Sequence, residues 1–191
     1  MANLGEIVAA YIRDHQARAH QEHDWFASQP SLREAVRLAA LAQDCCGKRL
    51  SHQRRIPHGV LLRCQRRLLD HIREIRTCRT FDQLHETIVR ALRGVRGAGE
   101  LYYYDTAERI SAKLGIPPTR IYLHAGTRAG ARTLGINGSR ATIEVGELPH
   151  ELRTLAPEEL ESLLCLYRDQ LAGAPLRDIS GCGLKRRRPT C

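Results

Sequence analysis

Apolar residues recur at helical spacing along most of the chain, and this pattern predicts a mainly α-helical protein. Over residues 4–27 they return every three or four positions. Pro30 ends this predicted helix, because proline has no backbone N–H with which to continue it. Ser31 and Glu34 then form the S-x-x-E pattern of a capping box, which predicts the start of a second helix over 31–44.

Three further helices are expected before residue 115. The first covers about 60–76, and its arginines lie away from the apolar stripe. Thr80 is the expected N-cap of the next helix, whose apolar positions continue to residue 92. A glycine-rich turn over 94–99 leads into a third helix, which Gly115 ends.

The pattern is ambiguous over 119–146, where short β-strands are also compatible with the sequence. The stretch TRIYLHAGTRAGARTLG fits either one helix or a short strand, a turn and a helix capped by Thr127. RATIEV, residues 140–145, is the best strand candidate. A strongly patterned helix is expected from about Pro157 to Leu171, with acidic residues at its start.

Together these elements predict one compact multi-helix domain over residues 1–172 and a flexible basic tail over 173–191. A length of 191 residues fits a single domain. The tail is rich in glycine, proline and arginine, and its end, GCGLKRRRPTC, is expected to be disordered. The KRRR run is interpreted either as a phosphate-binding arm or as a solubilising end.

The sequence predicts a cytoplasmic protein that does not span a membrane. No apolar run approaches the roughly 20 residues that cross a bilayer. Glu6 follows the N-terminus closely, and the apolar stretch after it is too short for a signal peptide. The chain contains seven cysteines, an odd number, so we expect them to be reduced thiols.

Positive charge changes this picture, because it is concentrated in one part of the chain. The net charge is +9, which favours an acidic partner. Residues 47–96 contain 13 Lys and Arg against 4 Asp and Glu, whereas residues 147–172 contain 2 against 6. Nearly all the basic residues are arginines, which bind phosphate with a bidentate fork. A GC-rich genome would explain the preference for arginine equally well, but it would not explain the clustering.

The basic segment leads directly into a glycine-broken turn. Residues 94–110 read GVRGAGELYYYDTAERI. An apolar helix, the VRGAG sequence at 95–99 and a second helix together resemble the helix-hairpin-helix motif of DNA-repair proteins, including DNA glycosylases. The resemblance covers about residues 84–114.

The resemblance implies that this turn binds a DNA phosphate, largely without reading the base sequence. In this family the backbone N–H groups of the hairpin and the N-terminus of its second helix hold the phosphate, and glycines allow the close approach. The expected contacts are the backbones of Gly97 and Gly99, with Arg93 and Arg96 beside them. The partner is then double-stranded DNA or structured RNA; aromatic residues, at 5%, are too few to favour a single strand.

A plain corner between two packed helices is the alternative interpretation of this turn. Glu100 opens the second helix, where its carboxylate competes with a phosphate for the same N–H donors. Tyr103 stands where the family often has a small residue. Leu101 stands where relatives with lyase activity carry a lysine, and IPPTRIY, where most carry the catalytic aspartate, has no acid. The catalytic pattern of the glycosylases is therefore not matched.

Two further groups extend the predicted nucleic-acid contact. SHQRRI, residues 51–56, forms a loop whose residue types contact phosphates and bases well, with a solvated loop as the alternative. Its candidate residues are His52, Gln53, Arg54 and Arg55. On the helix after the glycine turn, one stripe is expected in the core and a second stripe is expected to face a nucleic-acid strand. The first stripe is Tyr103, Ala107, Ile110 and Leu114, and the second is Tyr102, Thr106, Arg109 and Lys113.

An enzyme that acts on nucleic acid or a nucleotide, glycosylase-like or a hydrolase, is the second functional interpretation. YLHAGTRAGA, residues 122–131, is another glycine-rich turn, whose amides would hold a phosphate with Thr127 as the cap and Arg128 at the edge. His124 or Asp105 would act as acid or base. The alternatives are close helix packing at the glycines, a satisfied core histidine, and a surface ion pair between Asp105 and the arginine four residues on.

No metal ion or cofactor is expected. The nine histidines and seven cysteines include no C-x-x-C pair, and no set of ligands has the spacing of a zinc site. A protein–protein interaction module is the third functional interpretation. The acidic C-terminal helix over 157–171 would then pair with another chain or with a second copy.

Overall fold

The computed structural model describes residues 3–176, and these residues form two compact units. We call residues 3–20 together with 118–176 the terminal unit, and residues 21–117 the central unit. The sequence predicted a single helical domain over 1–172. The structure differs because the apolar face of the first helix, including Ile7 and Tyr11, is buried with residues from the C-terminal third of the chain.

Both units are built mainly from α-helices, as the sequence predicted. The first stretch is helical from end to end and comprises α1 (Leu4–Tyr11), a π-helical turn (Ile12–Gln16) and α2 (Ala17–Ala27). Asn3 caps α1, because its side chain accepts a hydrogen bond from the backbone N–H of Gly5 at 3.1 Å. The helix predicted over 4–27 is therefore confirmed, with a π-helical turn that the pattern did not indicate.

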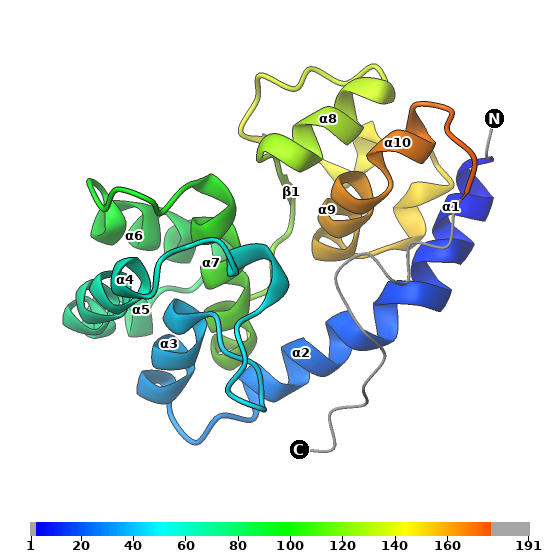
Figure 1. Ribbon diagram of the computed structural model, residues 1–191. Coiled ribbons are helices and arrows are strands. Elements are labelled where there is room, and N and C mark those ends of the chain that lie inside the picture. The colour runs from blue at the N-terminus through cyan, green and yellow to red at the C-terminus, as the bar shows by residue number, and fades with distance from the viewer. Residues whose placement is uncertain (1–2, 177–191) are drawn as a thin grey trace. The chain divides into compact units, whose positions relative to one another are not determined.

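The central unit is a bundle in which α3 (Leu32–Leu41) packs on α4 (His58–Asp70) and α7 (Glu100–Leu114). The helix α6 (Phe81–Leu92) packs on α4 and α7, and the short α5 (Ile72–Thr77) packs on α6 (Figure 1). A short 3-10 turn, Ser51–Gln53, lies in the connection from α3 to α4. The largest fully buried side chains of this unit are Phe26, Leu61, Leu68, Ile75, Leu84, Ile88, Leu92 and Ile110.

Local capping signals determine where two of these helices begin. The Ser31 hydroxyl accepts a hydrogen bond from the backbone N–H of Glu34 at 3.1 Å, and the Thr80 hydroxyl accepts one from Gln83 at 3.3 Å. Both N-caps were predicted. Glu34 does not complete the capping box, because its carboxylate binds Arg37 instead.

The helix predicted over 60–76 is interrupted at His71, which separates α4 from α5. The backbone of His71 has φ −94° and ψ 13°, outside the α-helical region, and its ring Nδ1 lies 2.8 Å from the carbonyl oxygen of Arg67. Gly115, at φ +68°, ends α7 as the sequence predicted.

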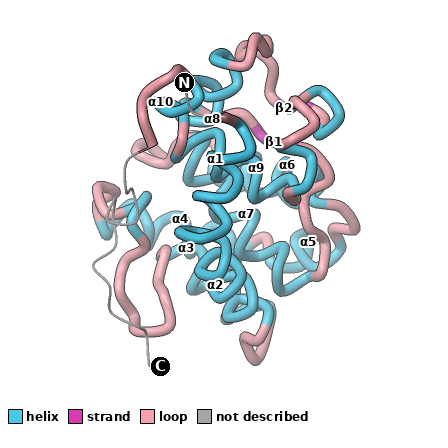
Figure 2. The backbone as a smooth tube through the Cα atoms, turned by 90° about the vertical axis from the view of Figure 1, so that its right-hand side faces the viewer, coloured by secondary structure: helices cyan, strands magenta, loops and turns pink. Residues whose placement is uncertain are grey.

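In the terminal unit, α8 (Ala125–Thr133) packs against α9 (Pro157–Leu166) and α10 (Arg168–Leu171). The strands β1 (Ile121–Tyr122) and β2 (Thr142–Ile143) pair antiparallel, and they are the short magenta segments of Figure 2. The strand predicted within 140–145 is confirmed, and the preceding stretch adopts the strand–turn–helix alternative. Two 3-10 turns, Val145–Glu147 and Leu152–Thr154, precede α9 in the chain.

Two glycines allow α8 and α9 to pack closely. A Cβ atom added at Gly130 would lie 2.1 Å from the carbonyl oxygen of Leu164, and one added at Gly126 would lie 2.4 Å from the sulfur of Cys165. At Gly130 the close atoms belong to the backbone, so this position has no room for a larger residue, and at Gly126 the Cys165 side chain would have to shift. The helix-packing interpretation of these glycines is therefore confirmed.

The helices within residues 3–176 include none with both the length and the apolar character needed to cross a bilayer. The KRRR run and the rest of the predicted tail beyond residue 176 lie outside the described residues.

Candidate nucleic-acid interface

The glycine turn, which we define as residues 93–99, joins α6 to α7 in the central unit. Gly94 and Gly97 have φ values of +81° and +94°, in the left-handed region that other residues rarely adopt. Gly99 is extended and stands at the N-cap of α7. Val95 is buried and anchors the turn to the core. The turn and the helix after it lie where the sequence predicted them.

Side chains from α4 and α7 hold the glycine turn in place. Arg67 Nη1 donates a hydrogen bond to the carbonyl oxygen of Arg93 at 2.8 Å. The Tyr103 hydroxyl donates to the carbonyl oxygen of Ala98, also at 2.8 Å. Tyr103 therefore braces the turn from the helix that follows it.

The outer side of the glycine turn is open to solvent and positively charged. Arg93, Arg96, Gly97 and Gly99 are all exposed. The first turn of α7 adds backbone N–H groups that have no acceptor inside the helix, and Gly99 has no side chain with which to cap them. An anion at this position would meet N–H donors and the positive end of the helix dipole, with the exposed arginines in the turn before it and the opposing carboxylate of Glu100 in the first turn of α7.

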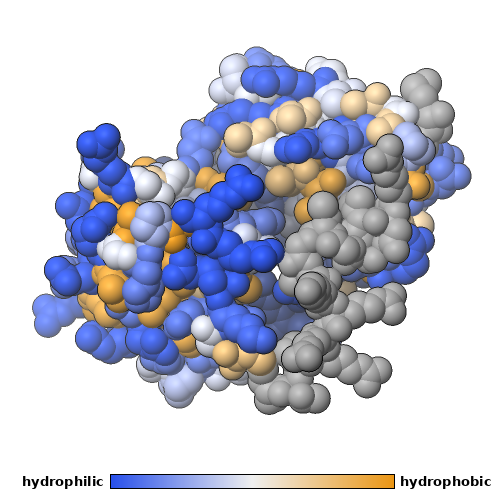
Figure 3. Space-filling view, in the orientation of Figure 1, coloured by the Kyte–Doolittle hydropathy of each residue, from blue (hydrophilic) through white to orange (hydrophobic). Residues whose placement is uncertain are grey.

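Exposed arginines continue from the turn onto α4. Arg67 contacts the turn directly, and Arg63 lies one helical turn before it, also exposed. Of the 13 basic residues over 47–96, all but Arg49 are exposed. Figure 3 shows hydrophilic residues over much of the side where Figure 1 places α4, α5 and α6, with hydrophobic residues visible between them. The exposure of these basic residues places the charge that is clustered in the sequence on the surface of the central unit.

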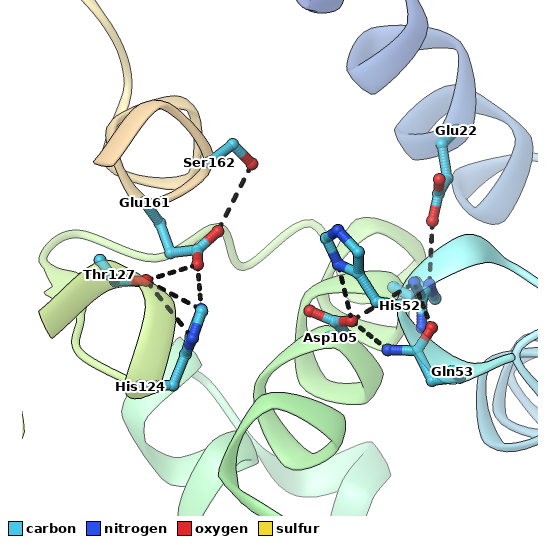
Figure 4. Close-up of polar contacts among 9 residues, drawn as sticks. Glu22, His52, Gln53, Asp105, His124, Thr127, Glu161 and Ser162 are labelled. Atoms are coloured by element: carbon cyan, nitrogen blue, oxygen red, sulfur yellow. Dashed lines mark hydrogen bonds and ion pairs between the residues drawn. The ribbon is translucent and has the colours of Figure 1, made fainter. Parts of the chain in front are cut away.

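A buried polar network lies behind the SHQRRI loop. Asp105 of α7 accepts a hydrogen bond from the Gln53 amide, and His52 Nδ1 lies 3.6 Å from the same carboxylate (Figure 4). Arg109 Nη2 lies 3.8 Å from Asp105, and Arg109 Nε donates to the carboxylate of Glu22 at 2.9 Å. The ion pair between Asp105 and Arg109 was predicted on the surface, but both side chains are buried.

The network keeps Asp105 charged in spite of its burial. Burial alone would raise the pKa of this carboxyl group, because it disfavours the charged form. The neighbouring His52 and the positive charge of Arg109 outweigh burial and hold the pKa of Asp105 below its usual value. Burial likewise opposes the charge on Arg109, but the carboxylates of Glu22 and Asp105 raise the pKa of its guanidinium.

Several residues that the sequence predicted to contact nucleic acid are buried instead. Gln53 is 1% exposed and Arg109 is 6% exposed, and both side chains bind within the network.

The prediction that one stripe of α7 faces a nucleic-acid strand is wrong, because α3 packs on α7 and most of the stripe is buried. Tyr102 is 2% exposed and donates its hydroxyl hydrogen to the carbonyl oxygen of Ala40 at 2.7 Å, and Thr106 is fully buried. The loop residues that remain exposed are His52, Arg54 and Arg55.

A carboxylate of the protein itself occupies the second glycine-rich turn, in the terminal unit. His124 Nε2 and the Thr127 hydroxyl both bind Glu161 of α9, the hydroxyl at 2.8 Å (Figure 4). His124, rather than Thr127, stands at the N-cap of α8. Both side chains are buried, so His124 is the satisfied core histidine of the alternative interpretation. Arg128 is partly buried beside them.

The enzyme interpretation offered His124 or Asp105 as the acid or base. Asp105 belongs to the central unit, whereas His124 belongs to the terminal unit. Each side chain has partners inside its own unit, namely Gln53 and Arg109 for Asp105 and Glu161 for His124. The structure therefore gives each of them a role in holding its own unit together.

The sequence analysis missed three residues that hold these sites together. Glu161 looked like one more exposed acid of the last helix, Glu22 lay in a long polar stretch, and Arg67 stood on the polar side of its helix. Each of them binds a residue far away in the sequence, and helical periodicity carries no information about such pairs. Within residues 3–176, no three His, Cys, Asp or Glu side chains gather closely enough to hold a metal ion.

Comparison of the chain with models of known protein families, with curated proteins and with solved structures found no significant match.

Proposed function

We propose that the protein binds nucleic acid, preferentially double-stranded DNA, through backbone phosphates at the glycine turn. One observation supports this most directly. An exposed turn built on glycines precedes the N-terminus of α7, and Arg93 and Arg96 are exposed within it. The α4 residues Arg63 and Arg67 extend the positive surface from there.

Each part of this arrangement contributes a different interaction with a phosphate. The N–H groups at the start of α7 donate hydrogen bonds, as helix N-termini do at other anion sites. Gly97 and Gly99 leave the backbone open to close approach, and the arginines pair with phosphate oxygens. None of these contacts reads a base edge, so binding is expected to be largely independent of sequence.

The distribution of charge and aromatic residues favours a duplex. Exposed arginines extend over the SHQRRI loop, α4 and the glycine turn, which suits a continuous line of phosphates. Tyr102 and Tyr104 are buried, so the tyrosine cluster after the turn offers little surface on which unpaired bases could stack. The cytoplasmic location expected from the sequence is part of the same proposal.

The variant Gly99→Val tests the site with the least disturbance of the fold. Gly99 has φ −119° and ψ −177°, which valine adopts readily, and a Cβ atom there meets nothing within 4 Å. Gly97 is unsuitable, because its φ of +94° would strain any other residue and a Cβ atom would lie 3.3 Å from Val60. Gly146→Val is a matched control, since a Cβ atom at Gly146 also meets nothing within 4 Å.

Binding of a labelled DNA duplex is measured by fluorescence anisotropy at several salt concentrations, with an unlabelled RNA duplex as competitor. We expect Gly99→Val to bind about tenfold more weakly than wild type, since it removes one or two charge-assisted hydrogen bonds. Gly146→Val should bind as wild type. In Arg93→Ala/Arg96→Ala, the slope of log K against log salt should fall by about 2, because each phosphate contact contributes about 0.9.

Two results would contradict the proposal. Equal binding by Gly99→Val and wild type would exclude the glycine turn as the phosphate site. A wild-type protein that binds neither duplex at low salt would exclude the function itself. Stronger competition by the RNA duplex would instead identify structured RNA as the partner.

A further inference from the structure

Cys45 and Cys46 stand together at the tip of a small hairpin-like loop in the central unit. The base of this loop is closed by a hydrogen bond from the backbone N–H of Leu50 to the carbonyl oxygen of Ala42 at 2.7 Å. Between these positions, Gln43 and Arg49 form an isolated antiparallel bridge. The two cysteines therefore lie on a chain segment whose ends are held together.

Asp44 organises the tip of the loop. Its carboxylate Oδ1 accepts the backbone N–H of Cys46 at 3.0 Å and that of Lys48 at 2.8 Å. Its own backbone N–H donates to the carbonyl oxygen of Lys48 at 2.9 Å. Gly47, at φ +69°, supplies the left-handed turn residue that this closure requires. The backbone on both sides of the cysteines is thus ordered by hydrogen bonds.

The two sulfur atoms are close to each other and open to solvent. Cys45 and Cys46 are thiols, both are exposed, and their Sγ atoms are 4.0 Å apart. For comparison, two thiolates bound to one tetrahedral zinc ion with bonds of about 2.3 Å are roughly 3.8 Å apart. The loop therefore holds its sulfurs near the separation at which one atom can bond to both. By contrast, Cys64 and Cys78 are buried.

We propose that Cys45 and Cys46 form a dithiol site for compounds of trivalent arsenic that carry one organic group. Phenylarsine oxide is the simplest probe of this class. Two S–H bonds break, two As–S bonds form, and the oxo oxygen leaves with both protons as one water molecule. No electron is transferred, so no oxidant or reductant is needed.

The loop tip carries two sulfur atoms, and this number suits a ligand that forms two bonds to sulfur. An arsenic atom with one organic group has two positions left for exchange, and the two cysteines fill both. A metal ion that prefers four protein ligands would require further donors.

Titration of the reduced protein with phenylarsine oxide, followed by intact-mass spectrometry and thiol counting, tests the proposal. The wild type is expected to take up one phenylarsenic group per chain with the loss of two titratable thiols. Cys45→Ser and Cys46→Ser should each bind on the order of 10²-fold more weakly, because the second As–S bond is then no longer intramolecular. Both variants change exposed side chains, so their circular dichroism and melting curves should match wild type.

Two controls use other cysteines of the chain. Cys165→Ser and the double variant Cys182→Ser/Cys191→Ser should bind the probe as wild type does. Undiminished binding by Cys45→Ser and Cys46→Ser would overturn the proposal, as would loss of binding in either control. An adduct that bridges two chains, seen by native mass spectrometry, would overturn it as well.

Discussion

Asp105 is a charged group inside the protein, and its partners determine how much it stabilises the fold. Its carboxylate binds Gln53 and lies 3.8 Å from Arg109, with 5% of the residue exposed. Asp105→Asn keeps the shape of the side chain but removes one of the carboxylates that face the Arg109 guanidinium. We expect a loss of about 3 kcal/mol in the free energy of unfolding, measured with urea at neutral pH, because removal of one partner exposes the cost of burying the other.

The pH dependence of stability gives a second readout for the same variant. The pKa of Asp105 is lower in the folded protein than in the unfolded chain, so its contribution is fully present above the usual aspartate value of about 3.9. That contribution is lost as the pH falls below this value and through the folded pKa. Wild type should therefore lose more stability than Asp105→Asn between pH 5 and acidic pH. The control is Asp24→Asn, at a side chain that is 83% exposed, and it should change the free energy of unfolding by less than about 0.5 kcal/mol.

Residues with local partners were predictable, and residues with distant partners were not. Ser31 and Thr80 cap helices through the N–H group three residues on, and that spacing is visible in the sequence. Glu161 binds Thr127 and His124 across more than thirty intervening residues. Nothing in the sequence pattern of α9 distinguishes Glu161 from Glu158 and Glu159, so the contacts of Glu161 could be identified only from the structure.

At the scale of elements, the contact between α8 and α9 depends on Gly130. A Cβ atom there would lie 2.1 Å from a backbone oxygen of α9, which no side-chain rotation can relieve. Gly130→Ala should therefore lower the free energy of unfolding by about 3 kcal/mol, the upper part of the usual range for overpacking, although alanine favours the helix. Urea unfolding followed by circular dichroism measures this loss. Gly146→Ala, where an added Cβ atom meets nothing within 4 Å, is the control, and an equal effect of both changes would contradict the packing argument.

Periodicity predicted the existence of helices better than it predicted their faces. The helices at 4–27, 32–41, 81–92 and 100–114 appear where their apolar positions indicated. On α7, however, the stripe with Tyr102 and Thr106 is buried, while Tyr103 is partly exposed. Tyrosine is compatible with either environment, so three tyrosines in a row leave the orientation of the helix undetermined. The packing of α3 on α7 decided it.

At the scale of the whole molecule, the single predicted domain became two units. The first helix contributes Ile7 and Tyr11 to the core of the terminal unit, and Phe26, farther along the same helical stretch, is buried in the central unit. Helical spacing shows that each of these residues faces a core. It does not show which core, because that depends on segments more than a hundred residues away.

Net charge describes the molecule as a whole, whereas a binding site requires the charge to be in one place. Glu100→Gln and Asp169→Asn each raise the net charge of +9 by one unit, but Glu100 opens α7 beside the glycine turn and Asp169 lies in α10 of the terminal unit. If phosphates bind at the turn, removal of the Glu100 charge relieves a repulsion of about 0.7 kcal/mol at roughly 6 Å in water, which is about a threefold gain in affinity for duplex DNA. Anisotropy titrations should show this gain at low salt and its decline as salt screens it. The same variant should lose about 0.5 kcal/mol of stability, because an acid at a helix N-terminus is favourable. A gain of equal size in Asp169→Asn would mean that overall charge, and not the glycine turn, governs binding.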